Sequence, residues 1–255
     1  MTGTYMRKIA SVSVAVVIAL LAGSARAEAG KSDAERMHAT EMNAGIPASR
    51  EILRGGGFRV LVYGNYIAHH RPSAKIGWTN SWGMAASSLD RDFASLTVKG
   101  LEERLGKKAD YRVKTLYRLE CDPRAFEVEK TLADDVAFCP DYVVIAIGEN
   151  VRSLATDEEK DVYRTRLEEI ARMFRKDGRN PKIVYRSPFW RNELKARLTK
   201  EAAEATGSLY VDSGPLGGDP ANKALGLFAH PGVAGHPGDL GMRRLADLIL
   251  GALEK

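Results

Sequence analysis

Cysteine is nearly absent from this sequence: only Cys121 and Cys139 occur in 255 residues, and no histidine cluster accompanies them. Structural zinc sites need four such ligands at short spacings, so the sequence predicts no metal site. A site built from His69, His70 and His236 is the remaining alternative, although no adjacent carboxylate motif supports it. Internal repeats and low-complexity blocks are also missing.

A basic stripe with interleaved aromatic residues is missing too. The net charge of +5 is spread along the chain, with acidic residues between the basic ones. Proteins that bind nucleic acid through phosphate contacts gather their positive charge on one surface. We therefore expect no nucleic-acid partner.

The one long apolar run, residues 9–22, is shorter than the ~20 residues of a membrane-spanning helix. Arg7 and Lys8 precede it and a small-x-small segment, 25–27, follows it, which is the pattern of a secretory signal peptide. We predict a signal peptide over 1–27 and a periplasmic or secreted mature chain without a membrane span. An uncleaved N-terminal anchor is the alternative. A lipoprotein would need a cysteine at the cleavage point, and the sequence has none there.

Export to an oxidising compartment bears on the two cysteines. It favours a disulfide between Cys121 and Cys139, which would close a loop and stabilise the fold by roughly 3 kcal/mol. Two buried free thiols are the alternative.

Strand-like segments alternate with helix-like ones after residue 55. The glycines 55–57 precede an almost continuous apolar run, 58–63, and such runs indicate parallel strands buried on both faces. Further strands are predicted at 111–117, 142–147, 183–185 and 209–211.

Apolar residues at helical spacing lie between these strands. They predict a helix capped by Ser88, a helix opened by the capping box Thr156–Glu159, and a closing helix from Met242 to Leu253. The alternation predicts a three-layer α/β sandwich with a central parallel sheet of about five strands. Residues 28–54 are predicted to form an N-terminal arm, and 55–255 a single domain.

Three loops carry unusual residues where strands end or the last helix begins. Gly64-Asn65-Tyr66 follows the first strand, Gly148-Glu149-Asn150 follows the strand 142–147, and His236 precedes the closing helix. In a parallel sheet, ligands bind at the carboxyl ends of the strands. Each loop alone is an ordinary turn, cap or surface histidine, but their order predicts a shared site.

These loops resemble the sequence blocks of the SGNH (GDSL-type) hydrolases over nearly all of the mature chain. The turn 64–67 is similar to the family's first block, and Gly83 within 82–87 is similar to the second. The segment 148–150 is similar to the family's Gly-x-Asn, and His236 with Pro237 is similar to its last block. The stretches 76–92 and 187–190 resemble an exported bacterial branch.

The resemblance implies an ester hydrolase without a cofactor, acting on a small-molecule or carbohydrate ester such as an O-acetyl group. It implies that Gly83 and Asn150 donate to an oxyanion and that His236 is the base. Donors aimed at a developing negative charge contribute several kcal/mol, and the pKa of histidine, ~6.5, suits proton transfer.

The chain departs from the family at two positions. Tyr66 occupies the place of the serine nucleophile, and its phenol has a pKa of about 10 and fills more space. Val233 stands where the family has an acid that orients the histidine, so a backbone carbonyl or Asp239 must substitute, unless Asp239 caps the last helix. A displaced serine nucleophile is the alternative to Tyr66, with the candidates Ser73, Ser81, Ser87 and Ser88.

Three functions follow from this pattern. The first is an ester hydrolase of strongly reduced turnover. The second is a non-catalytic relative that binds a carbohydrate, with Asn65 and His70 as binding residues and with Tyr66 and Trp78 as stacking surfaces. The third, a structural protein, leaves the shared presence of His236 and Asn150 unexplained.

Overall fold

The computed structural model describes residues 49–254 of the chain. The predicted signal peptide and residues 28–48 of the predicted arm lie outside this part. Within residues 49–254, no helix has both the length and the apolar character that a membrane crossing requires.

Six strands form one sheet in the order β1-β3-β2-β4-β5-β6. The parallel strands are β2 (Phe58–Gly64), β3 (Ala109–Thr115), β4 (Tyr142–Ile145), β5 (Lys182–Arg186) and β6 (Leu209–Val211). The edge strand β1 (Ser49–Ile52) pairs antiparallel with β3. The predicted α/β sandwich with a parallel sheet is confirmed, and residues 49–52 of the predicted arm add a sixth, antiparallel strand.

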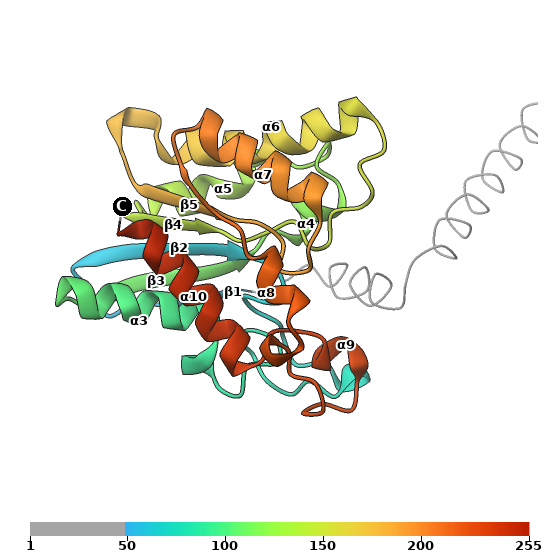
Figure 1. Cartoon of the computed structure of the whole chain (residues 1–255). Coiled ribbons are helices and arrows are strands. Elements are labelled where there is room, and N and C mark those ends of the chain that lie inside the picture. The colour runs from blue at the N-terminus through green and yellow to red at the C-terminus, as the bar shows by residue number, and fades with distance from the viewer. Residues whose placement is uncertain (1–48, 255) are drawn as a thin grey trace, which may run out of the picture. The chain divides into compact units, whose positions relative to one another are not determined.

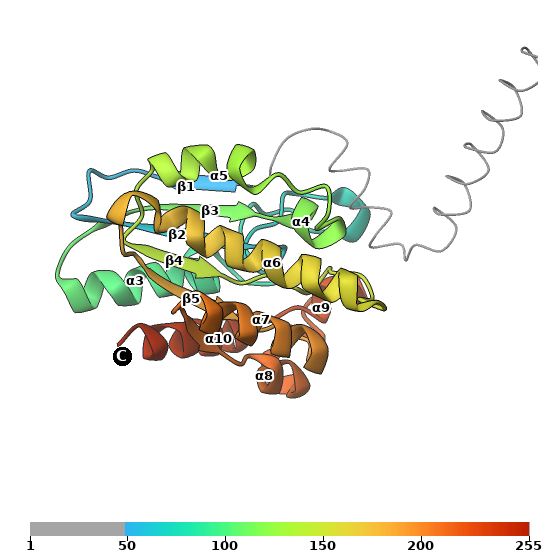
Figure 2. The same ribbon diagram turned by 90° about the horizontal axis from the view of Figure 1, so that it is seen from above.

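Helices cover both faces of this sheet, as Figures 1 and 2 show. The helices α3 (Phe93–Leu105) and α10 (Asp239–Leu253) pack on one face, and α5 (Val128–Ala137), α6 (Asp157–Phe174) and α7 (Glu193–Ala205) on the other. Alternation along β2 explains both cores: Val60 and Val62 join the α3/α10 cluster, while Leu61 and Tyr63 join the opposite one. Successive strand side chains point to opposite faces, so a run buried throughout needs helices on both.

Local signals placed some helix ends correctly. The capping box of α6 is confirmed, because the Thr156 side chain accepts from Glu159 N–H and the Glu159 carboxylate accepts from Thr156 N–H. The predicted cap at Ser88 is wrong: Asp92 caps α3, and its carboxylate accepts from Ser95 N–H at 2.8 Å. Asp92 also forms an ion pair with Arg50 on β1, a partner 42 residues away that local sequence does not reveal.

The predicted disulfide is not formed, since Cys121 and Cys139 are not bonded to each other. Cys121 is the last residue of α4 (Tyr117–Cys121), which begins just after the carboxyl end of β3. Cys139 follows α5 and precedes β4. Because β3 and β4 run in the same direction, the carboxyl end of β3 and the amino end of β4 lie at opposite edges of the sheet. The two cysteines are therefore kept apart, whereas a disulfide needs Cα atoms about 4.4–6.8 Å apart.

The chain leaves β2 toward β3 on one side of the sheet, and later places β4 on the other side of β2. Such a reversal of direction is the point where open parallel sheets bind ligands, outside the carboxyl ends of the strands. The loops that follow β2 and β4 begin at this point.

Candidate active site

The loop after β2 is a tight turn that Asn65 closes. Its carbonyl oxygen accepts from Ala68 N–H at 2.9 Å and from His69 N–H at 3.0 Å, and its side-chain Oδ1 accepts from Ile67 N–H at 3.1 Å. Asparagine suits this position because its side chain can bond to backbone two residues ahead. Tyr66 therefore lies on the turn after β2, within hydrogen bonds that Asn65 makes to residues 67–69.

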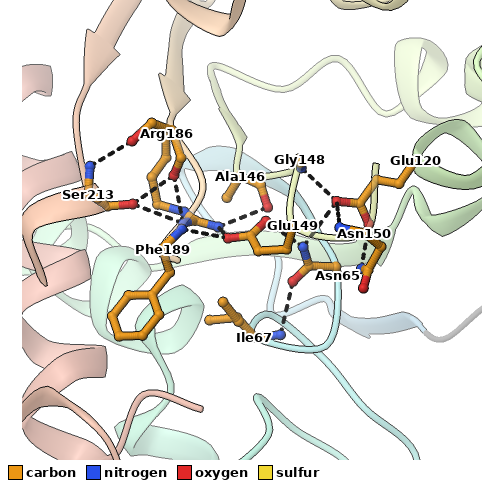
Figure 3. A network of polar contacts seen from close by, with 12 residues as sticks. Asn65, Ile67, Glu120, Ala146, Gly148, Glu149, Asn150, Arg186, Phe189 and Ser213 are labelled. Atoms are coloured by element: carbon orange, nitrogen blue, oxygen red, sulfur yellow. Dashed lines mark hydrogen bonds and ion pairs between the residues drawn. The ribbon is translucent and has the colours of Figure 1, made fainter. Parts of the chain in front are cut away.

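The loop after β4 begins with Gly148 at φ 127°, a backbone conformation that glycine adopts readily. The two residues after it, Glu149 and Asn150, point to different partners in Figure 3. A Cβ at Gly148 would lie 3.0 Å from Pro188 Cγ and 3.1 Å from the hydroxyl of Tyr163, so a larger residue would have to displace one of these side chains.

The fully buried Glu120 on α4 accepts hydrogen bonds from both loops (Figure 3). The donors are Gly148 N–H at 2.6 Å, Asn150 N–H at 3.3 Å, Asn150 Nδ2 at 2.8 Å and Asn65 Nδ2 at 3.2 Å. Burial, and then the negative charge of Glu149, raise the pKa of Glu120 to about 7.

Glu149 forms a second centre in the same network. It pairs with Arg186 at 2.7 Å, and it accepts from Asn65 Nδ2 at 2.6 Å and from Phe189 N–H at 3.0 Å. Its carboxylate thus connects the loops after β2, β4 and β5. Asn65 bridges the two glutamates and is 2% exposed, so its side chain presents no group to a ligand, contrary to its predicted binding role.

His236 lies between α9 (Pro231–Ala234) and α10 and is half-buried. Its Nδ1 is 2.6 Å from the carbonyl oxygen of Gly232, which can only accept, so we assign the proton to Nδ1. Burial is the main cause that lowers the pKa of His236 to about 4. The ring is therefore neutral at pH 7, with Nε2 as the basic nitrogen.

A backbone carbonyl thus takes the place of the acid that is missing at Val233. Asp239, the other candidate, binds elsewhere: its carboxylate accepts from Ser87 N–H at 2.8 Å and from Ser87 Oγ at 2.7 Å. It also pairs with Arg91, and Gly238 is the residue that precedes α10 as its cap. Asp239 therefore connects the start of α10 to the segment that leads to α3, and its carboxylate accepts the hydrogen bond of the Ser87 hydroxyl.

Aromatic contacts connect Tyr66 with its surroundings. Its ring lies 4.4 Å from the ring of His70 and stacks on Tyr117 at 6.2 Å. The charge of His70 in turn lowers the pKa of His236, and that of Glu149 raises it, so these groups lie within electrostatic reach of one another. His70, which the sequence predicts as a binding residue, thus lies beside Tyr66, although its side chain is only 2% exposed.

The two predicted oxyanion donors differ in what they can still offer. The single N–H of Gly83 donates to the buried carboxylate of Asp92 at 3.1 Å, so it is not available to a ligand. The carboxamide of Asn150 has two N–H bonds, and Glu120 takes one of them. Asn150 is half-buried and can still donate once.

Trp78 is 1% exposed and presents no stacking face to a sugar, contrary to prediction. It packs against Trp82 and Phe228, and its indole N–H donates to the carbonyl of His70. The exposed tryptophan near the site is Trp190, whose ring lies 5.0 Å from that of His236 and which is 36% exposed. In the part of the chain that the structure describes, no three metal-ligating side chains gather at one point.

Sequence reasoning missed Glu120, Arg186 and the role of Glu149. The signal for Glu120 was one acidic residue between Leu119 and Cys121, in a segment that also carries Arg118, which is too weak to assign a role. Arg186 ends a buried strand, where a charged residue is unusual unless it is paired.

No family model matches the chain, and no curated protein matches it either. Solved structures do. A candidate GDSL-like lipase from Parabacteroides merdae matches with a TM-score of 0.51 and 18% identity, over 77% of this chain and 95% of that one. A family two carbohydrate esterase from Cellvibrio japonicus matches with a TM-score of 0.50 and 17% identity, over 78% of this chain and 61% of that one. The chain thus spans less than two thirds of the second protein. At this identity the likeness establishes the fold, which is of the SGNH type.

Proposed function

We propose that this protein is an SGNH-type ester hydrolase of strongly reduced turnover, with acyl esters such as carbohydrate O-acetyl groups as its substrate class. The observation that carries the proposal is the state of His236. Its Nδ1 is held by the Gly232 carbonyl at 2.6 Å, and its lowered pKa leaves Nε2 unprotonated at neutral pH. A general base for ester hydrolysis must be an unprotonated, oriented imidazole. His70, whose ring contacts that of Tyr66, lies within electrostatic reach of His236, which supports a shared site.

Two features argue for the reduced rate. The phenol of Tyr66 is mostly protonated at neutral pH and its oxygen lies farther from the backbone than a seryl oxygen. The N–H of Gly83 donates to Asp92, and loss of one oxyanion donor typically lowers kcat ~100–1000-fold.

Binding of a carbohydrate without turnover is the second candidate. Trp190 favours it, because an exposed indole beside the site histidine can stack on the apolar face of a sugar ring. The likeness to a carbohydrate esterase from Cellvibrio japonicus supports the same class of ligand.

The cellular location is part of the proposal. The pattern of residues 1–27 supports export to the periplasm or the medium, where polysaccharide esters are found. Fractionation of cells that express the full chain, followed by N-terminal sequencing, tests it. A protein that starts at Met1 and stays in the cytoplasmic fraction contradicts it.

The function is tested with 4-nitrophenyl acetate and with an O-acetylated xylo-oligosaccharide. We expect the unmodified protein to hydrolyse both hardly faster than buffer, and Tyr66→Ser to raise the rate about tenfold or more, since one donor is still lost. His236→Ala should abolish that gain, while His230→Ala, an exposed residue that precedes α9, should preserve it.

Brisk turnover by the unmodified protein that disappears in His236→Ala overturns the reduced rate. If Tyr66→Ser shows no increase in hydrolysis rate, calorimetric titration with the acetylated and deacetylated oligosaccharides tests the second candidate, carbohydrate binding. Affinity that Trp190→Ala removes supports binding, and no affinity for either sugar rejects both candidates.

A further inference from the structure

Glu120 is an unusual residue for a protein interior. Its side chain is 0% exposed, and within the described residues no lysine, arginine or histidine forms an ion pair with it. Four N–H bonds from three residues compensate its charge instead. A carboxylate that accepts several hydrogen bonds can be kept in the interior, but removal of its donors is costly.

These donors come from the two loops that form the site. Asn65 belongs to the turn after β2 that carries Tyr66, and Gly148 and Asn150 belong to the turn after β4. The side chain of Glu120 enters from α4, between them, as Figure 3 shows. The carboxylate of Glu120 thus holds both loops together, although Glu120 belongs to neither loop.

The chemistry of this contact fixes the direction of an amide. An asparagine carboxamide has a donor end and an acceptor end of nearly equal shape, and both can face a neutral partner. An ionised carboxylate only accepts, so it selects the Nδ2 end of Asn150, 2.8 Å from Oε2. One N–H of Asn150 is then held, and the second points away from Glu120.

We infer that Glu120 is a positioning residue: it fixes the carboxamide of Asn150 so that the second Nδ2–H is presented to the acyl oxygen of a bound ester. The geometry of the contact carries this assignment, and its use in ester chemistry rests on the proposed function. Glu120 itself touches no substrate in this scheme.

The charge of Glu120 depends on the groups around it. Glu149 of the loop after β4, Tyr163 of α6 and Lys195 of α7 all interact with it electrostatically. Arg186 pairs with Glu149 and not with Glu120, whereas Lys195 acts on both glutamates without forming an ion pair with either among the described residues. With the pKa of Glu120 raised to about 7, its proton occupancy changes near neutral pH, and the hold on Asn150 changes with it.

The test follows the side-chain amide of Asn150 by NMR in protein labelled with 15N-asparagine, with Asn150→Ala used to assign the signal. In the unmodified protein the two Nδ2 protons should shift between pH 5 and pH 9 with a midpoint near 7. In Glu120→Gln this shift should vanish. The control Glu168→Gln removes another buried glutamate, one that pairs with Arg164 and Arg172 on α6, and should keep it.

A signal that stays constant over this range in the unmodified protein overturns the inference, and so does a shift that persists in Glu120→Gln. Because the unmodified protein gives the first readout, poor folding of a variant does not remove the test. These chemical shifts do not depend on turnover, so failure of this inference can be told apart from failure of the proposed function. If Tyr66→Ser is active, adding Glu120→Gln should lower kcat about tenfold or more with little change in KM.

Discussion

Arg186 and Glu149 form an ion pair in the interior, with 2.7 Å between Nη2 and Oε1 and side chains that are 0% and 2% exposed. The pair joins the end of β5 to the loop after β4. The guanidinium also donates to the carbonyl of Ala146 and to the hydroxyl of Ser213. The contacts of Glu149 with Asn65 and Phe189 extend the same connection to two further loops.

Replacing one partner of this pair should destabilise the protein strongly. Arg186→Met leaves the Glu149 carboxylate buried without a cation, and we expect a loss of about 3–5 kcal/mol in the free energy of unfolding. The double variant with Glu149→Gln should lose less than the single one. Urea unfolding measures the free energy of unfolding of the unmodified protein, the single variant and the double variant. As a control, Arg197→Met breaks the exposed pair with Glu201 and should cost less than about 1 kcal/mol. A double variant at least as unstable as Arg186→Met refutes the argument.

Two adjacent glycines of α8 (Gly214–Gly218) should respond differently to alanine. A Cβ at Gly217 would lie 1.8 Å from the carbonyl oxygen of Phe189, whereas nothing lies within 4 Å of one at Gly218. Backbone cannot yield cheaply, so Gly217→Ala should cost about 1–3 kcal/mol and should displace the loop that carries Trp190. Gly218→Ala should be neutral within about 0.5 kcal/mol. Thermal unfolding compares them, and equal midpoints contradict the close approach.

His69 should make the protein sensitive to acid. Its ring is 2% exposed, its Nδ1 has no hydrogen-bond partner among the described residues, and burial with the nearby charge of Arg50 lowers its pKa to about 4. Unfolded His69 binds a proton below pH ~6.5, and the folded form does so only near 4. Stability is therefore complete above 6.5 and is lost as the pH falls toward 4, by about 3 kcal/mol from this group.

The measurement is the pH dependence of unfolding in His69→Gln. The loss of stability from pH 6.5 to 4 should be smaller than in the unmodified protein, while the exposed His230→Gln should leave it unchanged. Glu120 acts in the opposite direction, because its raised pKa makes stability fall as the pH rises from ~4.5 to 7. For this reason the slope of the unfolding free energy against pH is compared between matched variants. Identical slopes in His69→Gln and the unmodified protein rule out His69 as a source of the acid sensitivity.

The parts of the structure that sequence predicted rest on local patterns. The run 58–63 predicted a strand buried on both faces, and Thr156 with Glu159 predicted the start of a helix, since both signals are complete within a few residues. The strand predicted at 111–117 lies at 109–115, because Tyr117 begins the short helix α4 instead. The antiparallel strand β1 escaped prediction because it pairs with β3, whose residues lie about 60 positions further along the chain.

By itself, the sequence determined the alternation that gives the α/β fold, the tyrosine on the turn after the first buried strand and the histidine before the last helix. Only the tertiary structure decided which polar groups remain available there. Gly83 gives its N–H to Asp92, Asn150 gives one N–H to Glu120, and Trp78 is enclosed while Trp190 is not. The physical reason is that a buried carboxylate takes its donors from whichever distant loops fold against it, and no pattern of neighbouring residues specifies that choice.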